Sequence, residues 1–347
     1  MPFADILGQA RAVSHLRLAV SDGRLSQAYC FFGPRGVGKH ATALALAQAV
    51  NCLAGPVRAP GGAGADACGA CAACRKVAAG LHPDVTEVRP EGKTVITIDQ
   101  VREVTVRTAL RAYEGKTKVF ILDPAELMQE PAANAILKTL EEPAGASLFI
   151  LVTAAPSALL PTILSRCQGV RFDPLGEGPL RDILLRHGRT PEGAAAAAAL
   201  AGGSAERALA LDVEEARATR DRIVEEVWGG LGSLVSVLER ADELARERAR
   251  FEGALEILAS FSRDLAVAKV GGGDASLVHA DRRAEVARLA AGCSLGAILA
   301  IHEAQAEAQR ALAKNANARF TAERMLLRMR QAVGEGQEGG HAGRSAR

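Results

Sequence analysis

Aromatic side chains are scarce in this sequence of 347 residues, which contains one Trp, two Tyr and nine Phe. Charge of one sign is not in excess either, because 42 Lys and Arg are balanced by 40 Asp and Glu. Binders of single-stranded nucleic acid combine a positively charged groove with aromatic residues that stack on bases. A free-standing, zinc-dependent nucleic-acid binder is therefore disfavoured, and we expect any contact with DNA to be local or shared with partners.

Long apolar runs are also absent. No stretch approaches the roughly 18 uninterrupted apolar residues of a membrane-spanning helix. The first ten residues, MPFADILGQA, lack the basic segment and apolar run of a secretory signal. We therefore expect a cytoplasmic protein without membrane contact. With 48% hydrophobic residues, a chain of this length forms substantial cores in two or three domains.

The order of apolar segments predicts an α/β domain followed by helices. Strands alternate with helices as far as residue 173, which indicates a parallel sheet with helices on both faces. The expected strands are residues 28–32, 84–88, 94–98, 119–122 and 148–152, and the expected helices are 3–23, 42–50, 99–112 (with Asp99 as N-cap) and 131–140, with a Gly- and Pro-rich loop at 53–66. Beyond Pro174 the strand patterns stop. We expect a small helical domain at 174–212, a larger helical domain at 213–333 with a glycine break at 271–273, and a disordered tail at 334–347.

The segment GPRGVGKH, residues 33–40, matches the phosphate-loop pattern GxxxxGK between a predicted strand and a predicted helix. Glycines let such a loop direct its backbone N–H groups at phosphate oxygens, and the lysine reaches the terminal phosphates. The alternative is a Gly-rich turn without a ligand. The predicted nucleotide-binding residues of this loop are Gly33, Gly36, Val37, Gly38, Lys39 and His40.

Two departures argue against hydrolysis. The residue after the lysine normally offers a hydroxyl to Mg²⁺, but here it is His40, and imidazole is a poor ligand for a hard cation. Asp123 ends a predicted strand and supplies the acid expected near the metal, but Pro124 follows it. Glu126 stands two residues further on, where we expect it to be aimed elsewhere. Magnesium binding is therefore doubtful and little ATPase activity is expected, whereas binding of ATP or ADP stays open.

Four cysteines form a second pattern. Cys52, Cys68, Cys71 and Cys74 have the spacing C-x15-C-x2-C-x2-C, which suits a tetrahedral structural zinc site. The alternative is a set of reduced thiols in a flexible loop. Cys30 and Cys293 lie in apolar runs and are expected to be buried, and His82, before Pro83, is expected to be a turn residue rather than a fifth ligand.

Taken together, these motifs resemble those of the AAA+ clamp-loader family. The segments FFGPRGVGKH, HPDV, NAILKTLEEP and LPTILSRC, with the four-cysteine insertion, are similar to the δ′ and γ/τ subunits of bacterial DNA polymerase III clamp loaders. The resemblance covers residues 1 to about 175 and continues weakly through Gly202–Ser204 and residues 315–319. It implies an AAA+ domain with an inserted zinc module (about 52–74), a helical lid and an all-α collar.

The resemblance also assigns roles. Motor subunits of the family carry Thr or Ser after the lysine and an Asp-Glu pair, so His40 and Asp123-Pro124 favour the δ′ type, the stator. Arg166, in Ser165-Arg166-Cys167, would be an arginine finger that acts in trans. Taken alone, the tripeptide would indicate a surface arginine by default. Thr153 would match the sensor-1 strand of the family, although Ala154 follows it. Arg207 stands one residue later than the second sensor arginine of the family.

The implied partners are γ/τ and δ subunits in a hetero-pentameric ring, the sliding clamp, and primed DNA reached through the complex. The implied cofactors are Zn²⁺ and, at the phosphate loop, ATP or ADP. The alternative function is an ATP-hydrolysing motor subunit of the γ/τ type.

Overall fold

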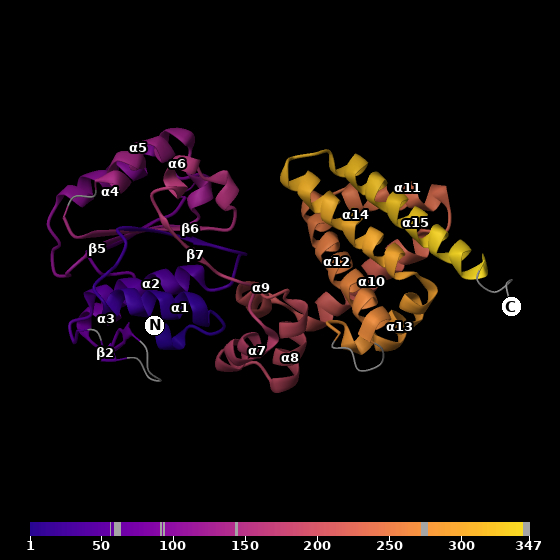
Figure 1. The fold of residues 1–347 in the computed structure, drawn as a ribbon, viewed down its shortest axis with the longest axis horizontal. Coiled ribbons are helices and arrows are strands. Elements are labelled where there is room, and N and C mark those ends of the chain that lie inside the picture. The colour runs from indigo at the N-terminus through magenta and orange to yellow at the C-terminus, as the bar shows by residue number, and fades with distance from the viewer. Residues whose placement is uncertain are drawn as a thin grey trace. The chain divides into compact units, whose positions relative to one another are not determined.

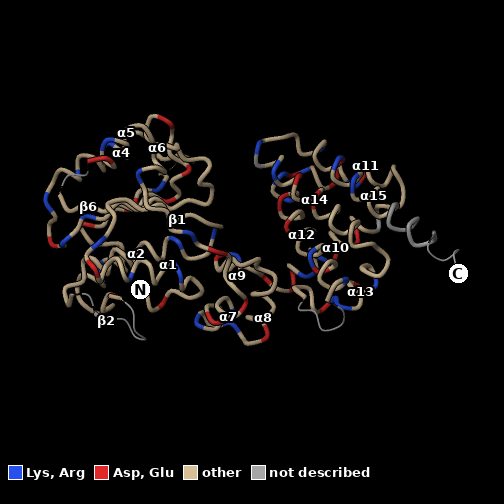
Figure 2. The backbone as a smooth tube through the Cα atoms, viewed as in Figure 1, with Lys and Arg blue, Asp and Glu red and all other residues tan. Residues whose placement is uncertain are grey.

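The computed structural model describes all residues except 56, 59–63, 91, 93, 143–144, 272–276 and 343–347. The chain forms two compact units, Met1–Ala210 and Leu211–Arg347 (Figure 1). Lys and Arg are interspersed with Asp and Glu in both units (Figure 2), as the balanced composition suggests.

The first unit is built on a parallel sheet of five strands in the order β4-β5-β6-β1-β7. The strands are β1 (Ala28–Phe32), β4 (Val85–Val88), β5 (Lys118–Leu122), β6 (Ser147–Thr153) and β7 (Gln168–Arg171). Phe32 pairs with Thr153, and Val88 pairs with Leu122, so the carboxyl ends of four strands meet at one edge of the sheet. Open α/β sheets bind their ligands at this edge.

Helices cover both faces of the sheet (Figure 1). One face carries α4 (Ile98–Ala109), α5 (Glu130–Glu141) and α6 (Pro161–Leu164), and the other carries α1 (Ala10–Ser21), α2 (Lys39–Asn51) and α3 (Ala72–Ala78). Every residue of β5 and β6 is buried, which explains why these strands are continuous apolar runs. Phe120 stacks on Phe149 on the α4 and α5 side at 5.2 Å between ring centroids.

The segment between α2 and α3 contains the short antiparallel pair β2 (Val57–Arg58) and β3 (Ala65–Asp66). The Asp66 carboxylate ties this segment to the N-terminus, since it accepts hydrogen bonds from the N–H groups of Phe3 and Ala4 at 2.9 Å and pairs with Arg17. Three 3-10 turns, η1 (Phe3–Asp5), η2 (Ala125–Leu127) and η3 (Pro156–Ala158), and three helices, α7 (Glu177–Arg186), α8 (Pro191–Leu200) and α9 (Ala205–Ala210), complete the unit.

The second unit is helical throughout its described residues. Its elements are α10 (Val213–Gly230), α11 (Leu234–Ala245), α12 (Arg248–Gly271), η5 (Ala280–Arg282), α13 (Arg283–Gly292), α14 (Leu295–Ala313) and α15 (Ala318–Ala342). The buried Arg220 donates two 2.8 Å hydrogen bonds to Asp281 and so fastens α10 to η5. Among the described helices none is by itself long and apolar enough to cross a membrane, although the bent pair Ala280–Gly292 and Leu295–Leu312 passes that test together.

The predicted fold class, an α/β domain with a parallel sheet followed by helices, is confirmed, but several details differ. Strand β7 was not anticipated, residues 94–98 contribute only a single bridge from Ile96 to Met128, and β2 and β3 lie within the expected loop 53–66. Helix α4 begins after Thr97, whose N–H donates to Gln100 Oε1, so Thr97 rather than Asp99 is the N-cap. Helix α15 extends through 334–342, part of the expected disordered tail. Residues 272 and 273 of the expected glycine break lie outside the described residues.

Candidate functional site

The phosphate-loop sequence forms the connection from β1 to α2, as expected. Gly33, Gly36 and Gly38 all have positive φ, at 146°, 72° and 95°. Two of them also have no room for a side chain, because a Cβ would lie 2.1 Å from Phe172 O at Gly33 and 2.1 Å from Ser204 Oγ at Gly36. Glycine is therefore required by backbone conformation and by packing at both positions.

Lys39 is the first residue of α2 and is folded over the loop that precedes it. Its Nζ donates to Gly33 O at 2.7 Å and to Pro34 O at 2.5 Å, and only 6% of the residue is exposed. Burial lowers the pKa of Lys39, and the nearby carboxylates of Asp123 and Glu126 act in the opposite direction. The ammonium group thus lies among the groups at the carboxyl edge of the sheet.

Helix α9 meets the phosphate loop through its first turn. The N–H of Ala205 donates to Gly36 O at 2.8 Å, and Glu206 Cβ would lie 2.8 Å from a Cβ at Gly36. The N–H of Arg207 donates to Ser204 Oγ at 3.3 Å. Ala205 and Glu206 are thus the residues of α9 that these contacts place against Gly36.

His40 and Asp123 contact each other directly. His40 Nδ1 lies 3.0 Å from Asp123 Oδ2. On the other side of the ring, Arg89 Nη2 lies 2.8 Å from His40 Nε2 and 3.0 Å from Glu87 Oε2. Arg89 Nη2 also lies 3.3 Å from His40 Nδ1, and Glu87 Oε2 lies 3.4 Å from His40 Nε2, so the ring contacts two carboxylates and one guanidinium. His40 therefore engages the Asp123 carboxylate, which a metal site would need.

Thr153 and Glu126 lie at the same edge. Thr153 ends β6, is buried, and accepts a hydrogen bond from the N–H of Ala155 at 3.0 Å. Glu126 Oε1 accepts from the N–H of Ala154 at 3.2 Å, and its other oxygen is buried without a hydrogen-bond partner among the described residues. Glu126 thus points to the end of β6 and lies closer to Lys39 than its position in the sequence suggested.

Arg166 lies beside α5 and α6. It follows α6, where Nη1 donates to Thr162 O at 2.9 Å and to Ser165 Oγ at 3.3 Å, and Nη2 pairs with Glu141 at the end of α5. Its side chain is 35% exposed. The guanidinium is therefore held at the surface of the first unit, and the contact with Glu141 was not anticipated from the sequence.

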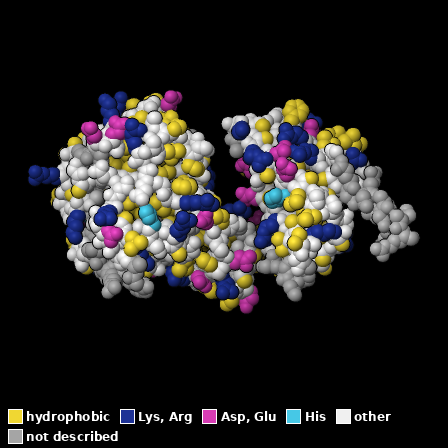
Figure 3. Space-filling view, viewed as in Figure 1, with side chains coloured by type: hydrophobic (Ala, Val, Ile, Leu, Met, Phe, Trp, Pro, Cys, Tyr) yellow, Lys and Arg dark blue, Asp and Glu magenta, His cyan; other side chains and the backbone are white. Residues whose placement is uncertain are grey.

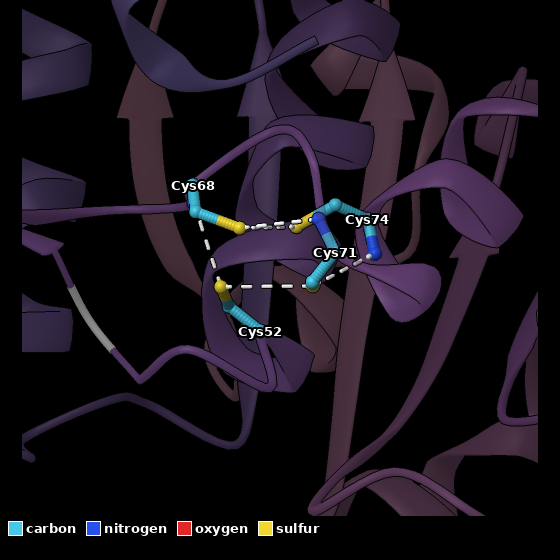
Figure 4. Close-up of side chains that lie close together, drawn as sticks. All are labelled: Cys52, Cys68, Cys71 and Cys74. Atoms are coloured by element: carbon cyan, nitrogen blue, oxygen red, sulfur yellow. Dashed lines mark hydrogen bonds between the residues drawn. The ribbon is translucent and has the colours of Figure 1, made fainter.

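The four cysteines converge as their spacing predicts (Figure 4). All four Sγ atoms lie within 4.8 Å of one another, and the Cys52–Cys71 and Cys68–Cys74 pairs are each 4.0 Å apart. Four sulfur ligands 2.3 Å from a tetrahedral zinc would lie about 3.8 Å apart, so the cluster fits the ion with little adjustment. Cys52 comes from the end of α2, Cys71 caps α3 and Cys74 lies within α3.

Backbone N–H groups already point at these sulfur atoms. The N–H groups of Cys68, Cys71 and Cys74 donate to the Sγ atoms of Cys52, Cys68 and Cys71 at 3.3–3.5 Å. Burial alone would raise the pKa of Cys71, but donors from Cys74 and Leu53 bring it down to about 6, and backbone donors also lower the pKa of Cys68. Burial raises the pKa of Cys52 and Cys74. Thiolate is the form that binds a metal.

Three further residues lie as the sequence predicts. His82 Nδ1 accepts the N–H of Asp84 at 3.2 Å, as a turn residue would. Cys30 and Cys293 are buried, with 2% and 6% exposure.

The first unit is therefore an α/β domain with a phosphate loop and a four-cysteine cluster. Residues 8–176 match the family described as DNA polymerase III, delta subunit. The delta′ subunit of DNA polymerase III from Bacillus subtilis is 29% identical over 330 residues, which are 93% of this chain and 96% of that protein. As its motifs predict, the chain resembles delta′ subunits of DNA polymerase III, and it is also similar to gamma/tau subunits.

Other relatives match over shorter stretches. The delta′ subunit of Pseudomonas aeruginosa is 40% identical over 58% of this chain and 60% of its own length. The gamma/tau subunit of Mycobacterium tuberculosis is 34% identical over 53% of this chain, which spans 31% of that longer protein. Among solved structures, a gamma subunit-related protein of Thermotoga maritima matches 92% of this chain and 99% of its own chain at 18% identity, with a TM-score of 0.35.

Proposed function

We propose that this chain is a delta′-type stator of a clamp loader, an AAA+ subunit that helps its ring to load the sliding clamp onto primed DNA. The ring would contain gamma/tau motor subunits and a delta subunit. In this assignment the chain hydrolyses little or no ATP itself, and Arg166 reaches the ATP site of a neighbouring motor.

The observation that carries the stator assignment is the 3.0 Å contact between His40 and Asp123. In a hydrolytic phosphate-loop site, a hydroxyl and an aspartate hold the magnesium ion. Magnesium requires oxygen ligands in near-octahedral geometry. Here a ring nitrogen replaces the hydroxyl and engages the aspartate as well. His40 and Asp123 therefore do not fit a magnesium ion, and we propose no magnesium-dependent hydrolysis at this site.

The position of Arg166 supports the trans role. An arginine finger must be presented at a surface rather than inside its own domain, and the Arg166 side chain is partly exposed at the end of a short helix. Its guanidinium would stabilise charge that develops on the transferred phosphoryl group of a neighbour's nucleotide. Before a neighbour's nucleotide is bound, the ion pair with Glu141 would keep the Arg166 side chain at the surface.

The cysteine cluster supports a structural zinc ion. All four ligand positions are thiols, which leaves no open position for a reacting water, as in other structural zinc sites. The ion would fix the segment between α2 and α3, which carries Asp66 and its contacts with the N-terminus.

ATP hydrolysis by the purified chain separates the stator from the alternative gamma/tau-type motor. We expect a rate that the variant Lys39→Ala leaves unchanged, because the chain lacks a metal-binding hydroxyl beside the loop. A magnesium-dependent rate that Lys39→Ala abolishes would show a motor and exclude the stator.

A further inference from the structure

Arg89 belongs to none of the motifs in the sequence, yet it lies beside the phosphate loop. It directly follows β4, at the same sheet edge as Asp123, which directly follows β5. The N–H of Asp123 donates to Val88 O at 3.0 Å, so the two strand ends are held side by side. The parallel sheet thus brings a cation to the residue that replaces the metal-binding hydroxyl.

The backbone of Arg89 is fixed by the first turn of α4. Gln100 Nε2 donates to Arg89 O at 2.7 Å, and Gln100 Oε1 accepts from the N–H of Thr97 at 3.0 Å. Gln100 therefore links the N-cap of the helix to the end of β4. The arginine is part of a built arrangement rather than a residue on a loose surface loop.

Part of the Arg89 guanidinium is available to bind a ligand. Within the described residues, its contacts with His40 and Glu87 run through Nη2, at 2.8, 3.3 and 3.0 Å. Nε and Nη1 have no partner there, and the side chain is 53% exposed. A guanidinium presents its N–H groups in a planar fork that matches two oxygens of a phosphate. In Arg89, only the Nη2 end of this fork contacts Glu87 and His40 among the described residues.

We propose that Arg89 takes the place of magnesium as the counter-charge for the phosphates, so that this loop binds nucleoside di- or triphosphates without a divalent cation. The proposal rests on the proposed AAA+ assignment and on the phosphate loop being a nucleotide site, as its sequence pattern predicts. His40 excludes the ion by engaging Asp123, and its contact with Arg89 at 2.8 Å keeps the guanidinium beside the loop. The site would retain a nucleotide as a structural ligand, since no metal is there to promote its hydrolysis.

The test measures binding of ADP and ATP to the full chain by titration calorimetry, in EDTA and in excess Mg²⁺. We expect the wild-type affinity to be the same in both conditions. Loss of a charge-assisted contact to phosphate in Arg89→Ala should weaken binding about tenfold or more in EDTA. Arg89→Lys should recover part of it, because the charge remains while the fork is lost.

Two further variants sharpen the result. Arg102→Ala removes the same charge from α4, where Arg102 pairs with Asp99 at the surface, and should bind like wild type. His40→Thr releases Asp123 and supplies a hydroxyl, so added Mg²⁺ should then strengthen binding. Circular dichroism shows whether each variant is folded.

Several outcomes would overturn the proposal. They are binding that requires Mg²⁺ in the wild type, unchanged binding in folded Arg89→Ala, or no binding of either nucleotide. None of these touches the trans role of Arg166, which is measured in the assembled ring. Conversely, loss of that trans role would leave metal-independent binding intact, so the two proposals fail separately.

Discussion

Asp84 illustrates how a single side chain fixes the geometry of the first unit. Its carboxylate accepts hydrogen bonds from the N–H groups of Tyr113, Glu114 and Gly115 at 2.7–2.9 Å. Burial alone would raise the pKa of Asp84, but these three donors bring it below its ordinary value. The residue therefore anchors the turn that leads into β5 and, through β5, the position of Asp123.

The replacement Asp84→Asn should lower the free energy of unfolding by about 1–3 kcal/mol at pH 7, since it removes a charged acceptor from buried donors. The folded-state pKa lies below the unfolded value of about 3.9, so this stabilisation is present above that pH and is lost as the pH falls through the folded pKa. Urea denaturation at pH 7 and pH 3 measures it. We expect the gap between wild type and variant to shrink at pH 3.

The matched control is Asp99→Asn, because Asp99 is exposed and pairs only with Arg102 among the described residues. It should have little effect at either pH. An equal gap for Asp84→Asn at both pH values would contradict the assigned role of the ionised carboxylate.

Site residues that belong to local sequence motifs were predicted, whereas residues that reach the site only through tertiary contacts were missed. The phosphate loop and the cysteine spacing are local patterns, and the structure forms both as expected. Arg89 and Glu141 become relevant only because the sheet and α5 bring them to His40 and Arg166. No spacing rule connects such residues, so a single sequence gives no signal for them.

At the scale of elements, burial decided which strands were predictable. Strands β5 and β6 are buried along their whole length and were evident as apolar runs. Strand β7 lies at the edge of the sheet, and of its four residues only Val170 is buried, so its sequence has no apolar run. The N-cap of α4 was displaced for a different reason: Thr97 and Gln100 form a reciprocal cap, which outweighs the local preference of Asp99.

The segment from α2 to α3 should depend on zinc. We expect about one zinc ion per chain, and Cys71→Ser should lose it, because a structural site requires all four ligands. Limited proteolysis should then cut within residues 52–74, while the sheet stays folded, since this segment is an insertion beside it. Elemental analysis measures the metal.

Cys293→Ser is the matched control, because Cys293 is a buried thiol of the second unit. It should retain the metal. Full zinc content in Cys71→Ser would remove this cysteine from the site.

At the scale of the whole molecule, the balanced charge fits a subunit that acts through partners. The face seen in Figure 3 carries basic and acidic side chains interspersed with hydrophobic ones. Nonspecific DNA binding depends on many Lys and Arg contacts to phosphates, and this composition offers no excess of them. We therefore expect this chain to act as one subunit of the proposed ring.

The central claim is that Arg166 acts on a neighbour's nucleotide. Arginines supplied in trans are worth about 10³–10⁵ in rate in well-studied GTPases. Arg166→Ala should leave this chain folded, zinc-loaded and able to assemble, because the side chain makes only surface contacts here. The control Arg171→Ala removes another surface arginine, one that pairs with Asp173.

The most direct measurement is DNA- and clamp-stimulated ATP hydrolysis by the reconstituted ring, with assembly checked by sedimentation. The account predicts a slower rate for the Arg166→Ala ring, limited to the one site that this chain faces, and a normal rate for Arg171→Ala. A fully assembled Arg166→Ala ring that hydrolyses ATP and loads clamps at the wild-type rate would contradict it.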